Sequence, residues 1–101
     1  MIVYKTTNLT TGKMYIGSTS RSFKKAIDDN YMGSQTELKA DIKKLGKDKF
    51  LFEVIERCKS LTQAREREKH YHQKYNVAKS DMYYNLKNGH YGTDGFTYSG
   101  D

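Results

Sequence analysis

The chain has 101 residues, of which 36% are hydrophobic and 30% charged, and it carries a net charge of +6 at neutral pH. A chain of this length supports one domain with a modest core, and its nine tyrosines supply burial area that its sparse aliphatic residues do not. The single cysteine excludes an internal disulfide and a cysteine-rich zinc site, so an intracellular, cytoplasmic location is expected.

The basic charge also indicates the kind of partner. Lysine and arginine interleaved with tyrosine suit a phosphate backbone better than an acidic protein, so nucleic acid is the expected partner. No apolar run approaches the roughly 20 residues that span a bilayer, and no membrane partner is expected.

The first predicted element is a β-hairpin. Residues 2–7 are β-branched and aromatic, residues 8–12 have turn chemistry, and residues 13–17 form a second strand-like run. Pairing of these strands would bring Tyr4 and Tyr15 together on one face of the hairpin. Cross-strand aromatic pairs also stabilise ordinary hairpins, so this proximity alone fits a structural role equally well.

Two helices are predicted next. Apolar residues recur at helical spacing over residues 23–31, and any of residues 18–20 could act as the N-cap. The second helix is expected to begin at Ser34, which has capping-box spacing with Glu37, and to end before Gly46.

A third strand and a third helix complete the predicted order. Residues 50–58 are aromatic and β-branched with apolar side chains on both parities, which predicts a strand buried on both faces. Ser60 and Gln63 again have capping-box spacing, and the helix they open is expected to run to about Tyr75. The order β-β-α-α-β-α predicts an α+β, or α/β-like, fold with a small three-stranded, mainly antiparallel sheet flanked by three or more helices.

The predicted domain covers residues 1–88. The stretch from 89 to 101 is rich in glycine and aromatic residues without apolar periodicity, and a loosely ordered tail is expected there.

The third helix contains a carboxylate on its less polar face. Glu66 lies about 200° around the axis from Glu68 and should face water. Glu68 could form a salt bridge with Lys69 or Arg65, or it could bind a divalent metal ion as one hard oxygen ligand. The residues that share the face of Glu68 at helical spacing are Leu61, Ala64, Tyr71 and Tyr75.

The hairpin and the third helix together resemble a known family. Ile2-Val3-Tyr4, followed after residues 5–14 by Tyr15-Ile16-Gly17, resembles the two-part signature of GIY-YIG nucleases, with Ile2 in place of the first glycine. Glu66-Arg67-Glu68 is similar to the metal-binding stretch of this family, and Tyr83-Tyr84-Asn85-Leu86 is similar to its terminal element.

The resemblance implies a function and a set of site residues. The function is that of a DNA endonuclease, most like the phage-type or homing enzymes, which hydrolyses phosphodiester bonds by metal-assisted water attack without an organic cofactor. Such an enzyme would act in a host cell. The implied catalytic residues are Tyr4, Tyr15, Glu68 and Asn85, the signature residues are Ile16 and Gly17, and Glu68 would bind one Mg²⁺ or Mn²⁺ ion.

The family's catalytic arginine is absent. In relatives this arginine contacts the scissile phosphate from the first helix, and its position here is Ala26. A methyl group cannot neutralise the charge that builds on phosphate oxygens, so a strongly impaired enzyme is expected. Ala26 could instead be an ordinary packed helix residue, a natural loss or a deliberate substitution, and the other retained signature residues favour the last.

Several further residues are expected to contact DNA. They are Lys13, Arg21, Lys24, Lys25 and Asn30, the last of which stands where many relatives carry histidine. His70 and His72 point to different sides of the third helix, which makes a shared metal site improbable and predicts surface or DNA-facing positions.

Two other functions fit parts of this pattern. A noncatalytic nucleic-acid-binding module would keep the fold and lack activity. A tyrosine-rich, basic protein-interaction domain would show no salt-dependent binding of DNA.

Overall fold

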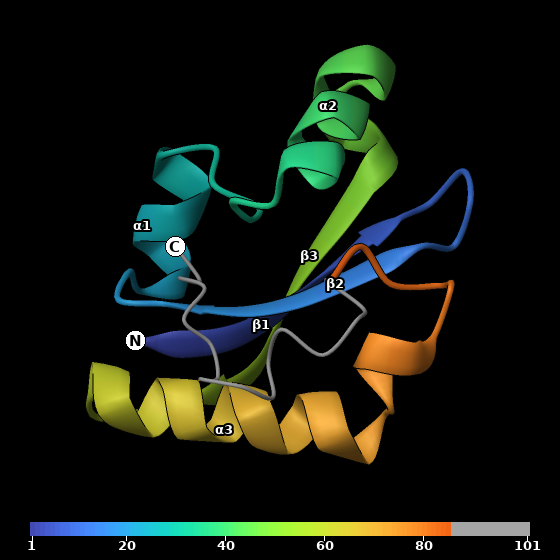
Figure 1. Cartoon of the computed structure of the whole chain (residues 1–101). Coiled ribbons are helices and arrows are strands. Elements are labelled where there is room, and N and C mark those ends of the chain that lie inside the picture. The colour runs from blue at the N-terminus through green and yellow to red at the C-terminus, as the bar shows by residue number, and fades with distance from the viewer. Residues whose placement is uncertain (86–101) are drawn as a thin grey trace.

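The β-branched and aromatic segments form a three-stranded antiparallel sheet in the computed structural model, which describes residues 1–85 apart from the side chain of Ala78. The strands are β1 (Ile2–Asn8), β2 (Met14–Thr19) and β3 (Phe50–Arg57), and β1 lies between the other two (Figure 1). The predicted hairpin is therefore confirmed, and the long connection from β2 crosses to the far side of β1. The predicted end of the domain at residue 88 and the predicted tail lie outside the described residues.

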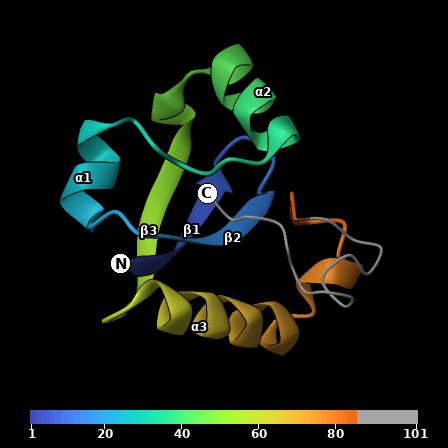
Figure 2. The same cartoon turned by 60° about the vertical axis from the view of Figure 1, so that its left-hand side comes forward.

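Helices cover both faces of the sheet. The helices α1 (Phe23–Asp28) and α2 (Thr36–Leu45) lie on one face, and α3 (Leu61–Lys74) lies on the other (Figures 1 and 2). Short 3-10 turns, η1 (Lys47–Lys49) and η2 (Val77–Lys79), precede β3 and follow α3. The element order confirms the predicted α+β fold.

Each face of the sheet has its own core. The larger core contains Tyr4 and Tyr15 from the hairpin, Leu38 from α2 and the phenylalanines of β3. The smaller core joins Val3 and Ile16 to α3 and η2. The alternation of side chains along β1 and β2 therefore divides the signature residues between the two faces.

The predicted caps are right for α3 and wrong for the first two helices. Ser60 caps α3, with its hydroxyl accepting a hydrogen bond from the Gln63 backbone N–H at 3.0 Å. Ser22 caps α1, because residues 18 and 19 still belong to β2 and pair with β1. Gln35 caps α2 in place of Ser34, since the Gln35 side chain accepts from the Leu38 N–H at 2.7 Å.

Two further predictions about the elements are wrong. Strand β3 is not buried on both faces, because Leu51 is 44% exposed. This strand is a sheet edge, and α3 packs against β2 and β1. Helix α1 ends at Asp28, and Asn30 adopts a left-handed backbone conformation with φ of 56° that turns the chain. Tyr31 consequently leaves the helix and lies in the α1–α2 connection.

The Ser60 cap gives a prediction for stability. Ser60→Ala removes the acceptor for one of the unpaired N–H groups in the first turn of α3, and it should lower the free energy of unfolding by about 1 kcal/mol. Urea denaturation followed by circular dichroism measures the change. The control is Thr62→Ala, at an exposed position in the same turn, which should cause no loss. An equal loss in both variants would contradict the cap.

Candidate active site

The two signature tyrosines pack together across the hairpin. Tyr4 pairs with Gly17 in the strand register, two residues from Tyr15, and the ring centroids of the tyrosines lie 6.1 Å apart. Both side chains are buried. The predicted juxtaposition of these tyrosines is therefore confirmed.

Gly17 is required by space at this point. A β-carbon on Gly17 would lie 2.6 Å from Tyr4 Oη and 2.8 Å from Tyr15 Cε2, closer than carbon atoms approach in folded proteins. The two aromatic rings therefore lie over the bare backbone of Gly17. The signature glycine allows the tyrosines to meet at the surface of β2.

A pair of hydroxyl groups forms the polar part of this face. Tyr4 Oη lies 3.1 Å from Tyr31 Oη, and either oxygen can donate the hydrogen bond. Burial, assisted by the nearby Tyr15 and Tyr31, raises the pKa of Tyr4 well above its usual value. The Tyr4 phenol is therefore neutral at pH 7 and is not suited to act as a general base. We call Tyr4 Oη and Tyr31 Oη the hydroxyl pair.

Glu68 is the buried carboxylate of α3. Its side chain is only 2% exposed, and Oε1 accepts a hydrogen bond from the Ser18 hydroxyl of β2. The charge of Glu68 contributes to the raised pKa of Tyr4, so the two groups share one electrostatic environment. Glu66, two residues earlier, is exposed as predicted.

His72 corrects the prediction for the histidines. It is not on the surface, because its side chain is 6% exposed and its Nε2 lies 2.9 Å from the carbonyl oxygen of Ile16 and 3.5 Å from Glu68 Oε2. Burial lowers its pKa, and the hydrogen bond to Ile16 opposes this only partly. The nearby carboxylate would suit a charged ring, but the degree of burial favours a neutral imidazole that donates from Nε2 to the Ile16 carbonyl.

The buried face of α3 differs from the face that was predicted from the sequence. It runs through Ala64, Glu68 and His72 at intervals of four residues, whereas Tyr75, predicted on this stripe, is 46% exposed. The i, i+4 spacing from Glu68 was the signal in the sequence that could have placed His72.

Asn85 is bonded to the backbone of the same strand. Its Oδ1 accepts from the Ile16 N–H at 3.1 Å, and its Nδ2 donates to the Ile16 carbonyl at 2.8 Å. The Tyr84 N–H donates to the carbonyl of Met14 at 2.7 Å, which places this segment along the outer edge of β2. Asn85 therefore fixes the peptide groups that precede Gly17.

The oxygen groups around Glu68 are of the kind that could hold a metal ion. Glu68 supplies a carboxylate, Ser18 supplies a hydroxyl, and no cluster of three or more His, Cys, Asp or Glu that could hold a metal occurs within residues 1–85. Mg²⁺ and Mn²⁺ are commonly held by one or two carboxylates, with water and phosphate oxygens in the other positions. Glu68 and Ser18 are therefore the residues of this site that could hold such an ion.

Ala26 is fully buried in the larger core. It is 0% exposed and belongs to the cluster that contains Tyr4 and Leu38, while its carbonyl accepts from the Tyr31 N–H at 2.8 Å. Of the two apolar neighbours of Ala26 on α1, Phe23 packs against the same cluster, whereas Ile27 is 47% exposed. The methyl group of Ala26 is therefore part of the core packing between α1, α2 and the sheet.

The residues predicted to contact DNA lie in different places. Lys24 and Lys25 form ion pairs with aspartates one turn further along the chain, at 2.9 and 3.3 Å. Lys13 pairs with a glutamate of α2 at 2.9 Å, and Asn30 accepts a hydrogen bond from a lysine of η1. Of this predicted set, Arg21 is the residue that contacts the ring of Tyr31.

This arrangement is that of a GIY-YIG nuclease domain. It consists of the tyrosine hairpin with Gly17, the carboxylate of Glu68 on α3, and Asn85 bonded to the edge of β2. The sequence model of the family described as "Putative endonuclease segE, GIY-YIG domain" matches residues 1–88, and the chain belongs to this family.

One similar protein is longer than this chain. The chain is 36% identical over 87 residues to the protein of that name from Enterobacteria phage T4. This match covers 86% of the chain and 40% of the phage protein, so the chain spans less than half the length of that relative. No solved structure matches the chain. No helix within the described residues is long and apolar enough to cross a membrane.

The close approach at Gly17 gives a second prediction. Gly17→Ala should lower the free energy of unfolding by about 1–3 kcal/mol, because the added methyl group must push the two tyrosine rings apart. Urea denaturation measures the loss. Ser20→Ala, at an exposed position three residues later, is the control and should leave stability unchanged. If Gly17→Ala were as stable as the unmodified chain, the rings would not require this glycine.

Proposed function

We propose that this domain is a DNA endonuclease that hydrolyses phosphodiester bonds by water attack with the help of one Mg²⁺ or Mn²⁺ ion. The observation that carries the proposal is the buried carboxylate of Glu68, held by Ser18 of the signature strand. Burying a carboxylate away from water costs free energy, and binding of a cation by that carboxylate would offset this cost. Membership of an endonuclease family and the net charge of +6 support DNA as the substrate.

Each residue of the site has a chemical role in this proposal. Glu68 and Ser18 would hold the ion, which when bound would polarise a phosphate oxygen and lower the pKa of a water ligand. The hydroxyl pair would orient the attacking water through hydrogen bonds, since the Tyr4 phenol stays protonated. Asn85 and His72 would act as positioning residues, because they hold the Ile16 peptide next to the site.

A second candidate is a noncatalytic DNA-binding module with the same fold. The observation that favours it is the buried Ala26 at the position of the family's arginine. Without a cation on the scissile phosphate, the rate should fall on the order of 10²-fold or more. The impairment predicted from the sequence therefore depends on whether another residue supplies that charge.

Nicking of supercoiled plasmid in the presence of Mg²⁺ tests the proposed activity. Glu68→Gln should lower the rate on the order of 10²-fold or more, because the amide is neutral and a poor ligand for a hard cation. Glu66→Gln, on the exposed side of the same helix, is the matched control and should cleave like the unmodified chain. Titration of Mn²⁺ followed by calorimetry should show binding that Glu68→Gln removes. Equal nicking by both variants would exclude Glu68 from the reaction, and salt-dependent DNA binding without any nicking would favour the noncatalytic module.

A further inference from the structure

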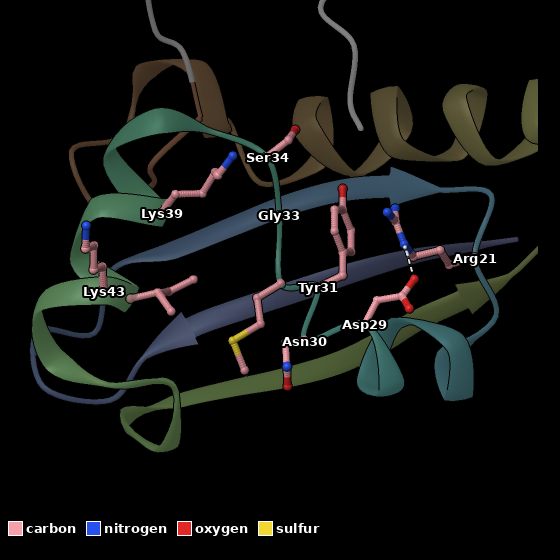
Figure 3. Close-up of a pocket in the computed structure, with 10 residues that line it drawn as sticks. Arg21, Asp29, Asn30, Tyr31, Gly33, Ser34, Lys39 and Lys43 are labelled. Atoms are coloured by element: carbon pink, nitrogen blue, oxygen red, sulfur yellow. Dashed lines mark hydrogen bonds and ion pairs between the residues drawn. The ribbon is translucent and has the colours of Figure 1, made fainter.

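Arg21 lies directly beside the hydroxyl pair. It follows β2 in the loop that leads to α1, and its guanidinium carbon is 4.0 Å from the centroid of the Tyr31 ring. The hydroxyl of that ring is 3.1 Å from Tyr4 Oη. Figure 3 shows the guanidinium of Arg21 and the hydroxyl of Tyr31 side by side and pointing the same way. A cation is thus held next to the groups expected to orient water.

The guanidinium is fixed on one edge and open on the other. Arg21 Nε donates to Asp29 Oδ2 at 3.2 Å, and Nη1 donates to Thr19 Oγ1 at 3.1 Å. The Arg21 hydrogen bond is the main cause that lowers the pKa of Asp29, so this carboxylate stays charged and holds its partner. Nη2 forms no hydrogen bond with any of residues 1–85, and the side chain is 33% exposed. This free edge can still form a bidentate contact with two oxygens of a phosphate.

The space beside Arg21 suits a nucleic-acid strand. A pocket of about 460 Å³ opens there, and Lys39 and Lys43 from α2 line it together with Arg21 and Tyr31 (Figure 3). Asp29, its one acidic lining residue, is already paired with Arg21. Lys39 and Lys43 lie one turn apart, so both can approach successive phosphates of one backbone.

The two lysines of α1 that were also predicted to contact DNA are less well placed to bind the scissile phosphate. Lys24 is 85% exposed and pairs with Asp28, which directs it into solvent. Lys25 is 65% exposed and pairs with Asp29 Oδ1, the oxygen that Arg21 Nε does not bind. Both are lysines, which offer a point charge in place of a planar fork.

We propose that Arg21 supplies the guanidinium that contacts the scissile phosphate. It would take the role of the family's arginine, whose position in this chain is occupied by Ala26. This inference rests on the proposed endonuclease function. Negative charge accumulates on the non-bridging oxygens as water attacks phosphorus, and the free edge of Arg21 would bind those oxygens beside the hydroxyl pair. The site then needs no cation from the buried position 26.

Single-turnover nicking with protein in excess tests this role. Arg21→Gln should lower the rate on the order of 10²-fold, and Arg21→Lys should recover only a small part of it because one point charge replaces two aligned donors. Lys79→Gln removes one positive charge from η2, which lies across the molecule from α1 in Figures 1 and 2, and it should leave the rate unchanged. Thermal unfolding of each variant reports whether the fold is kept, and Arg21→Lys decides the question if Arg21→Gln does not fold.

DNA binding gives a readout that does not require cleavage. Fluorescence anisotropy of a labelled duplex at several salt concentrations should show the slope of log K against log salt falling by about one for Arg21→Gln and remaining the same for Lys79→Gln.

The two measurements separate failure of the inference from failure of the proposed function. If Arg21→Gln nicks at the rate of the unmodified chain while Glu68→Gln is inert, the role of Arg21 is overturned and the endonuclease function stands. If the unmodified chain itself fails to nick, the endonuclease function fails, and the catalytic role of Arg21 fails with it. An unchanged salt slope for a folded Arg21→Gln would also overturn the phosphate contact.

Discussion

The site depends on three consecutive residues of an edge strand, Ile16, Gly17 and Ser18, which are held from both faces and from the edge. Asn85 and His72 bind the peptide groups of Ile16, the tyrosine rings cover the bare backbone of Gly17, and the Ser18 hydroxyl binds Glu68. Edge strands usually leave backbone groups unpaired, and here the segment that contains Asn85 pairs with them. Because side chains alternate along a strand, one short segment joins the aromatic face of the sheet to the helix that carries the carboxylate.

Burial determines the protonation states in this site. Tyr4 and His72 are both buried, and in each case the low-polarity surroundings favour the neutral form, which moves the pKa of the phenol up and that of the imidazole down. Neutral groups can donate and accept hydrogen bonds without a competing charge, and both of these groups lie next to polar partners, Tyr31 for Tyr4 and the Ile16 carbonyl for His72. No buried side-chain nitrogen or oxygen within the described residues lacks a hydrogen-bond partner. The polar groups therefore hold one another in place before any substrate arrives.

The positions of the basic side chains, and not their number, determine which of them are free to bind a phosphate. Ion pairs with nearby carboxylates partly neutralise three of the lysines, Lys13, Lys24 and Lys25. Arg21 also pairs with a carboxylate, but one edge of its guanidinium remains free beside Tyr31. Ala26 is buried in the core that contains Leu38, whereas Arg21 reaches the Tyr31 ring from the loop before α1. The number of basic residues was evident in the composition, but their availability was not.

The sequence by itself determined the element order, the meeting of Tyr4 with Tyr15 and the inward direction of Glu68, because strand and helix periodicities depend on neighbours in the chain. Only the tertiary structure decided the hydrogen bond between His72 and the Ile16 carbonyl and the contact of Arg21 with the Tyr31 ring. Those features arise where segments distant in sequence meet, such as Ile16 with residues of α3 and Asn85, and local patterns carry no record of such contacts. The exposure of Leu51 has the same origin, since the position of a strand at the edge of a sheet is fixed by pairing with other strands.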